Sequence, residues 1–459
     1  MRPGCGWSNK HLHTCSPDRY TRGSIGAEPV TRSLIVFMML LSCTPLAARD
    51  DVLDAAVASG DATRVTAAVA ALAEDGSSSA MEQVIQSALL SGHPVIEQAA
   101  LTGLKKLQPG TGLDWLCVQG NRHPRKEVRD LLLGLLSKRP ETECFRVVLQ
   151  ALYDAEDSVA LKAIEVLDKK AHSGSIPHMI RALKHQEDQD RDLSLVAERI
   201  REMLQHQTGA DLFAASEWQA LWKGNQQVLE KGKKVDPSKV TMKGTGVRVE
   251  VPAFFGQELL SEKIVFVLDT SISMQERDPL PENSGKGQSD GGTEVPDRRT
   301  GGKSGDELPS SRMRLRRVQR ELKRMIRELP RSFHFCLLTF DEDVKRMSDQ
   351  LVPATPERKR RAIKFVDAFE PKGFTSTDRA LEAAFQIPGV RAIVLLSDGM
   401  PYRAKDPIDP EQLLAHIVEI NRFEHIPINT VGFSATSGNA GGFMEEISRR
   451  TGGKYTEVP

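Results

Sequence analysis

Residues 265–274 have the sequence VFVLDTSISM, in which an apolar run ends in one carboxylate and two hydroxyls. A short, unbroken apolar run predicts a strand that is buried on both faces, as strands of parallel sheets are. Asp269, Ser271 and Ser273 follow this strand at a spacing of two. Because alternate residues of an extended segment point the same way, one loop can bring all three side chains to a single point.

Strands and helices alternate through the C-terminal part of the chain, residues 261–459. Apolar runs that predict strands occupy residues 264–268, 333–340, 392–396 and 428–433. Apolar residues three and four apart predict helices at 313–329, 362–369, 378–385, 411–421 and 443–450. This alternation predicts a doubly wound α/β domain, in which helices cover both faces of a mostly parallel sheet. Ligands of such folds bind beyond the carboxyl ends of the strands.

Two further segments bring oxygen ligands to this predicted sheet edge. The segment KGFTSTD, residues 372–378, supplies Thr375 just before a helix, and SDG, residues 397–399, places Asp398 after a strand. Together with DTSIS they form an oxygen-only set of two carboxylates and three hydroxyls. Such a set suits a hard cation such as Mg²⁺, Mn²⁺ or Ca²⁺, whereas zinc favours His and Cys.

With these motifs in this order, residues 261–459 resemble a von Willebrand factor type A (VWA) domain. DTSIS matches the family's DxSxS, Thr375 stands where the family has its metal-ligating Thr, and SDG carries the family's second Asp. The resemblance implies a metal-ion-dependent adhesion site (MIDAS) that holds Mg²⁺ or Mn²⁺ directly or through water, with the ligand set Asp269, Ser271, Ser273, Thr375 and Asp398. A Glu or Asp of a partner protein would complete the coordination of the cation, which is recognition without turnover.

Ile272 and Phe374 depart from the motifs of bacterial VWA domains, which often have Gly at these places. The departure removes no ligand. It predicts stiffer loops or a more apolar rim around the metal.

An insertion follows the first motif at residues 275–311 and is rich in Gly, Ser, Pro and mixed charge. This composition predicts disorder, since the segment has too few apolar residues to offset its ordering entropy. Two interpretations are open: a tolerated surface insertion, or a segment that shields the metal face or contacts a partner. The basic helix that follows predicts a solvated face, with an anionic partner as the alternative.

Residues 49–208 consist of short amphipathic segments that predict helices. Related segments begin at His93, His123 and Glu156, which are 30 and 33 residues apart. A repeat of this length is typical of a helical solenoid. The stretch 156–188 resembles a HEAT repeat, with a plain helical bundle as the alternative, and the resemblance implies a surface for a second protein. Residues 209–260 are predicted to be a linker, with Trp218 and Trp222 anchoring a helix and a strand at 247–256.

The first 48 residues have the features of an export signal. The apolar run at 33–41 has the length of a signal-peptide core, and cleavage is predicted after Ala48. A translation start near Val30 is a second hypothesis, and LLSC at 40–43 resembles a lipobox that would anchor a lipid at Cys43. Beyond the cleavage sites, the odd number of cysteines without CxxC spacing excludes a zinc motif, although a Cys117–Cys144 bridge is left open.

Charge and motifs together limit the function. Lys plus Arg and Asp plus Glu both number 62, so no net field attracts nucleic acid. Residues 301–304, GGKS, end like a phosphate-binding loop, but the first Gly of that motif and a preceding strand are missing. The sequence predicts neither catalytic nor cofactor-binding residues.

The sequence therefore predicts an exported, bacterial-type, non-enzymatic protein that binds a protein partner through a MIDAS cation, as an adhesion or scaffold protein. The first alternative is an accessory VWA subunit of an AAA-type ATPase or a metal-insertion machine. That alternative is disfavoured by the export signal, since ATP is scarce outside the cytoplasm. A hydrolase that uses the cation is disfavoured by the lack of a base or nucleophile.

Overall fold

The computed structural model describes residues 47–170, 173–235, 251–279, 310–403, 406–433 and 439–458. The predicted signal sequence and lipobox, most of the predicted insertion, and the GGKS segment lie outside these residues. The same holds for the first part of the strand expected at 247–256. Within the described ranges, no helix is long and apolar enough to cross a bilayer.

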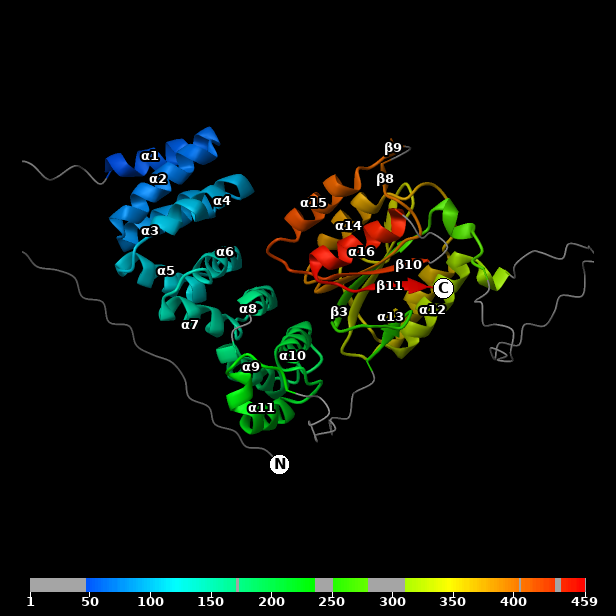
Figure 1. The fold of residues 1–459 in the computed structure, drawn as a ribbon. Coiled ribbons are helices and arrows are strands. Elements are labelled where there is room, and N and C mark those ends of the chain that lie inside the picture. Colours follow the sequence, from blue (N-terminus) through cyan, green and yellow to red (C-terminus); the bar gives the residue numbers. More distant parts are fainter. Residues whose placement is uncertain are drawn as a thin grey trace, which may run out of the picture. The chain divides into compact units, whose positions relative to one another are not determined.

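The first part of the chain is entirely helical, as the apolar periodicity predicted (Figure 1). Side-chain caps begin several of these helices; the Asp61 carboxylate, for example, accepts from the amides of Thr63 and Arg64 at the start of α2. The helices are α1 (Ala47–Ser59), α2 (Ala62–Asp75), α3 (Ser78–Val84), η1 (Ile85–Leu89), α4 (Pro94–Gly103), η2 (Leu104–Lys106), α5 (Thr111–Arg122), α6 (Lys126–Leu136), α7 (Thr142–Ala151), α8 (Asp157–Lys170), η3 (Ser173–Ser175), α9 (Ile176–Asp188), α10 (Leu195–Thr208) and α11 (Ala215–Leu229). The assignment of these helices to HEAT repeats stays a prediction.

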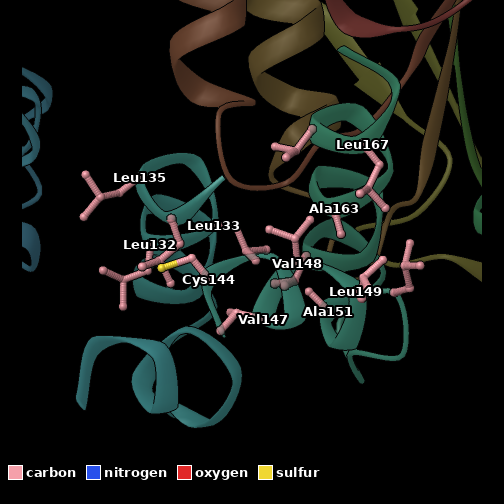
Figure 2. Close-up of a cluster of buried hydrophobic side chains, with 14 of the residues drawn as sticks. Leu132, Leu133, Leu135, Cys144, Val147, Val148, Leu149, Ala151, Ala163 and Leu167 are labelled. Atoms are coloured by element: carbon pink, nitrogen blue, oxygen red, sulfur yellow. The ribbon is translucent and has the colours of Figure 1, made fainter. Parts of the chain in front are cut away.

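One hydrophobic core joins the helices from α1 to α11, and Figure 2 shows the part of it between α6, α7 and α8. Close helix contact requires Gly103, because a Cβ there would lie 2.8 Å from the carbonyl oxygen of Thr66 on α2. Trp218 and Trp222 of α11 are buried in this core, so they anchor their helix on the helical region as expected.

The cysteines of the described residues are buried free thiols. Cys117 of α5 and Cys144 of α7 face each other with 3.7 Å between their sulfur atoms, and Cys336 lies inside the sheet of the C-terminal part. Burial raises the pKa of the Cys117 thiol to about 12. Because the thiolate is the reactive form, none of the three should react readily while the protein is folded.

We therefore expect the described cysteines to resist iodoacetamide at pH 8 in the native protein and to react within minutes in urea. Mass spectrometry of peptides containing Cys117, Cys144 and Cys336 measures the difference. Rapid native labelling of any of them would contradict the packing described above.

The C-terminal part is an α/β fold with a mostly parallel sheet, as predicted. The strands of this sheet run in the order β11-β10-β7-β3-β4-β5, and β6 pairs with β4. The pairs among β11, β10, β7, β3 and β4 are parallel, whereas β5 and β6 pair with β4 antiparallel. The strands are β3 (Lys263–Asp269), β4 (His334–Phe340), β5 (Val344–Arg346), β6 (Val352–Pro353), β7 (Ala392–Leu396), β10 (Ile428–Phe433) and β11 (Tyr455–Val458); the small pairs are β1 (Ala253–Phe254) with β2 (Gln257–Glu258), and β8 (Tyr402–Arg403) with β9 (Asp406–Pro407).

Helices cover both faces of this sheet (Figure 1). Alternate residues of β3 enter two different cores, with Phe266 in the core under α12 and α13 and Val267 in the core under α14, α15 and α16. This division explains why β3 is apolar at each position from Ile264 to Leu268. The helices are η5 (Ile272–Gln275), η6 (Ser310–Arg312), α12 (Arg314–Glu328), α13 (Pro356–Asp367), α14 (Thr377–Phe385), α15 (Pro410–Ile420) and α16 (Asn439–Thr451).

The basic helix α12 differs from its sequence prediction. A solvated face was expected for its basic residues, but Arg314 and Arg317 are buried, with 2% and 8% of their surfaces exposed. Arg316 and Arg320 are exposed as expected. The prediction failed because the carboxylates that pair with the two buried arginines lie far away in the sequence.

Candidate metal centre

The central strand β3 lies at the point where the order of the sheet reverses. The chain passes from β3 to its neighbour β4 on one side and then crosses to β7 on the other side of β3. In doubly wound sheets this reversal opens a crevice at the carboxyl ends of the strands. Asp269 ends β3 opposite Phe340 of β4, and Asp398 follows β7 closely, so both carboxylates reach this crevice.

Asp269 is fully buried and bound by neighbouring donors. Its Oδ1 accepts from the amide of Ser271 at 2.8 Å, and its Oδ2 accepts from the hydroxyl of Ser397 at 2.5 Å. Burial, together with the charge of nearby Asp398, raises the pKa of Asp269 to about 7. The ionised carboxylate is therefore costly at this position unless a positive charge stands beside it.

A chain of hydrogen bonds connects the first motif with the second aspartate. The hydroxyls of Ser271 and Ser273 are 3.0 Å apart, and the Ser273 hydroxyl donates to Oδ1 of Asp398 at 2.7 Å. Ser271, Asp269 and Asp398 are buried, whereas Ser273 is half-buried. The structure thus brings these side chains together, but not through the extended segment that was expected, because β3 ends at Asp269 and residues 272–275 form the 3-10 helix η5.

Thr375 lies beside the SDG turn, in the loop between α13 and α14. The amide of Ile272 donates to the carbonyl of Gly373 at 3.2 Å, which ties this loop to the first motif. Gly373 has φ of +67°, and a Cβ there would lie 2.9 Å from Cγ of Glu342, so only glycine fits. A Cβ on Gly399 would lie 3.3 Å from the Thr375 hydroxyl oxygen, which places that hydroxyl against the SDG turn.

An arginine that sequence reasoning missed also contacts this centre. Arg314, at the start of α12, donates from Nη1 to Oδ2 of Asp398 at 2.7 Å and from Nε to Oδ1 of Asp278 at 2.8 Å. Burial acts to lower the pKa of Arg314, but the hydrogen bonds to Asp278 and Asp398 outweigh it, so that pKa is raised. In the sequence, Arg314 is one of many basic residues in α12, with nothing that distinguishes it from the exposed Arg316 and Arg320.

The donor set fits a hard divalent cation. Two carboxylates and three hydroxyls converge with no nitrogen or sulfur donor among them: Asp269, Asp398, Ser271, Ser273 and Thr375. Groups of three or more His, Cys, Asp or Glu with metal-binding geometry do not occur in the described part of the chain. A cation here would therefore depend on hydroxyl ligands.

Apolar side chains flank the centre on the solvent side. Ile272 and Phe374 are 55% and 36% exposed, although most large apolar residues of this part of the chain are buried. The rings of Phe374 and Tyr402 lie 6.4 Å apart between centroids. We call Ile272, Phe374 and Tyr402 the apolar rim, a feature anticipated from the departures at residues 272 and 374.

A family model described as "von Willebrand factor type A domain" matches residues 309–456. The match includes Thr375 and Asp398 and begins after DTSIS. A human protein, von Willebrand factor A domain-containing protein 3B, is 26% identical over 151 residues, which is 33% of this chain and 11% of that protein. Human von Willebrand factor A domain-containing protein 3A is 27% identical over 143 residues, 31% of this chain and 12% of that protein. The chain thus covers only a small part of both curated relatives.

Similarities to solved structures are distant. A von Willebrand factor type A protein from Catenulispora acidiphila has a TM-score of 0.31 at 16% identity, covering 43% of this chain and 38% of the other. The PilB minor pilin from Streptococcus sanguinis also has a TM-score of 0.31 at 16% identity, covering 44% and 59%. Proximal thread matrix protein 1 from the mussel byssus, described "with zinc occupied MIDAS motif", has a TM-score of 0.27 at 18% identity, covering 42% and 40%. The family match and the curated relatives together support a von Willebrand factor type A domain in the C-terminal part of this chain.

Proposed function

We propose that this protein captures an acidic side chain of a partner protein through a divalent cation held by Asp269, Ser271, Ser273, Thr375 and Asp398. The observation that carries the proposal is the convergence of these oxygen donors at the carboxyl end of β3. A bound cation would supply a Lewis-acidic position for an incoming carboxylate. We propose Mg²⁺ as the resting metal, with Mn²⁺ or Ca²⁺ as substitutes, because hard cations favour oxygen ligands.

The residues of the chain have separate tasks in this proposal. Asp269 provides negative charge in a place without water, where a cation's charge is screened least. The hydroxyls of Ser271, Ser273 and Thr375 are neutral ligands, so only Asp269 and Asp398 offset the charge of the cation, and a coordination position is left for a partner. An acidic group of a partner is then attracted to it, which is recognition and not catalysis.

We also propose a cellular location and a second binding surface. The signal-like leader supports an exported adhesion or scaffold protein, with lipid attachment at Cys43 as a variant of it. The helical region would offer a surface to a second protein.

A peptide array tests the function directly. Peptides with a central Glu or Asp and their Gln or Asn counterparts are probed in Mg²⁺, in Mn²⁺, in Zn²⁺ and in EDTA. We expect binding to the acidic members alone, abolished by EDTA and by Asp269→Ala. Binding that is indifferent to the chelator and to Asp269→Ala would refute the proposal.

Cation affinity should depend on pH, because the pKa of Asp269 is raised to about 7 in the metal-free protein. Below that pH a cation must displace a proton, so affinity should fall about tenfold per pH unit, whereas above it affinity should be level. Without metal, stability should decrease as pH rises from about 3.8, the ordinary pKa of an aspartate in the unfolded chain, towards 7, since the folded state binds this proton more tightly than the unfolded chain does. Calorimetric Mn²⁺ titrations between pH 5.5 and 8 measure the effect, and a flat profile would contradict it.

The apolar rim should strengthen partner binding without affecting the metal. Phe374→Ser removes a half-exposed ring beside the centre, so we expect affinity for a binding peptide to fall about tenfold. Cation affinity should stay the same, since Phe374 offers no ligand. Val418→Ser, a change of a similarly exposed side chain on α15, is the matched control. Equal effects of the two substitutions would rule out a role for the rim.

A further inference from the structure

Arg314 occupies an unusual place for a basic residue. It is the first residue of α12, where the helix dipole disfavours positive charge, yet its side chain is only 3% exposed. A buried arginine is tolerated only when carboxylates pair with it. Three carboxylates do so here: Asp278 at 2.8 Å, Glu276 at 2.8 Å and Asp398 at 2.7 Å.

The backbone holds this arginine in position. The amide of Arg314 donates to the carbonyl of Glu276 at 2.9 Å, and the amide of Asp278 donates to the carbonyl of Arg312 at 3.1 Å. Residues 277 and 313 form an antiparallel bridge, so residues 276–278 and 312–314 make a paired strand-like element, which we call the neck. Arg317 pairs with the other oxygen of Asp278 and so fixes that carboxylate as well.

The Asp398 carboxylate therefore accepts hydrogen bonds from both the metal centre and the neck. Its Oδ1 accepts from Ser273 of the metal centre, and its Oδ2 accepts from Arg314 of the neck. A cation bound by the hydroxyls and the guanidinium of Arg314 would both interact with the carboxylate of Asp398. Both are positive charges held near one another in a region that is shielded from water, where their repulsion is strong.

We propose that Arg314 is an internal cation that competes with the divalent metal for Asp398 and sets the affinity of the centre below what its ligands alone would give. This inference rests on the proposed function. The carboxylates Asp269, Asp278, Asp398 and Glu276 stand against Arg314 and Arg317, a balance of minus two that one divalent cation neutralises. Removal of the Arg314 charge leaves a more negative centre and should raise its affinity for the cation. Any contact that displaces the neck would raise that affinity too.

The test compares Mn²⁺ binding to the full chain and to its variants by calorimetry and by electron paramagnetic resonance. Arg314→Gln is expected to bind Mn²⁺ at least about tenfold more tightly than the unmodified protein. Arg314→Lys keeps the charge and should bind nearly as the unmodified protein does. Arg320→Gln removes an exposed charge from the same helix and should leave the affinity unchanged.

The same experiment includes a check that each variant is folded. Far-UV circular dichroism establishes that each variant is folded, and the double substitution Arg314→Gln with Asp278→Asn removes the buried carboxylate that the single change would leave short of a partner. A folded Arg314→Gln variant that binds Mn²⁺ no more tightly than the unmodified protein, or a double variant that binds it no more tightly than Asp278→Asn alone, would overturn the inference, because Arg314 would then only orient Asp398. If neither the unmodified protein nor any Arg314 variant binds Mn²⁺, the proposed function itself fails.

Discussion

Asp269→Asn is expected to weaken Mn²⁺ binding by more than about 100-fold, because it removes the fully buried charge of the centre while preserving the shape of the side chain. Asparagine can still accept from the Ser271 amide, and its amide group can donate to the Ser397 hydroxyl, so the local fold should persist. Calorimetric titration measures the loss.

The same substitution should not destabilise the metal-free protein at pH 8. Since the pKa of Asp269 is raised to about 7, its ionised form is unfavourable in the folded state, and a neutral side chain relieves that cost. Unfolding in urea with EDTA present measures this second effect. Asp343→Asn, which removes an exposed carboxylate, is the control for both. Unchanged Mn²⁺ affinity in Asp269→Asn would contradict the assignment of this residue.

The second large effect is expected in the helical region. Trp218→Ala should lower the free energy of unfolding by about 3–5 kcal/mol, because this side chain is 1% exposed and its removal leaves a large cavity in the core. The indole Nε1 has no hydrogen-bond partner among the described residues, so Trp218→Phe should cost much less.

Urea unfolding followed by far-UV circular dichroism measures both changes. Val228→Ala, on the same helix and 40% exposed, is the control and should change stability by less than about 0.5 kcal/mol. A Trp218→Ala variant as stable as the control would show that α11 does not belong to the helical core.

The sequence revealed the strands of the sheet better than its edges. β3, β4, β7 and β10 are long apolar runs between two layers of helices, and burial on both faces leaves a signal that a single sequence shows. The short strands β5 and β6 and the final strand β11 were not predicted. Their partly exposed residues form strands through pairing with β4 and β10, which local sequence does not encode.

Some residues of the candidate site could be predicted from the sequence, and one could not. Asp269, Ser271 and Ser273 were proposed as ligands from their spacing after a strand, and Thr375 and Asp398 from their places beside a helix and a strand and from the family motifs. Arg314 was missed because its meaning depends on Asp278 and Asp398, which are 36 and 84 residues away from it. A buried charge in a basic helix looks the same in sequence as an exposed one.

The central claim is that a divalent cation binds at the carboxyl end of β3. A crystal of the full chain grown with Mn²⁺ and measured at the manganese absorption edge tests it most directly. The account predicts one anomalous peak within ligand distance of the hydroxyl oxygens of Ser271, Ser273 and Thr375, which disappears in Asp269→Asn. No peak at these hydroxyls in saturating Mn²⁺, or a peak of undiminished height in Asp269→Asn at a Mn²⁺ concentration that only just fills the unmodified site, would contradict it.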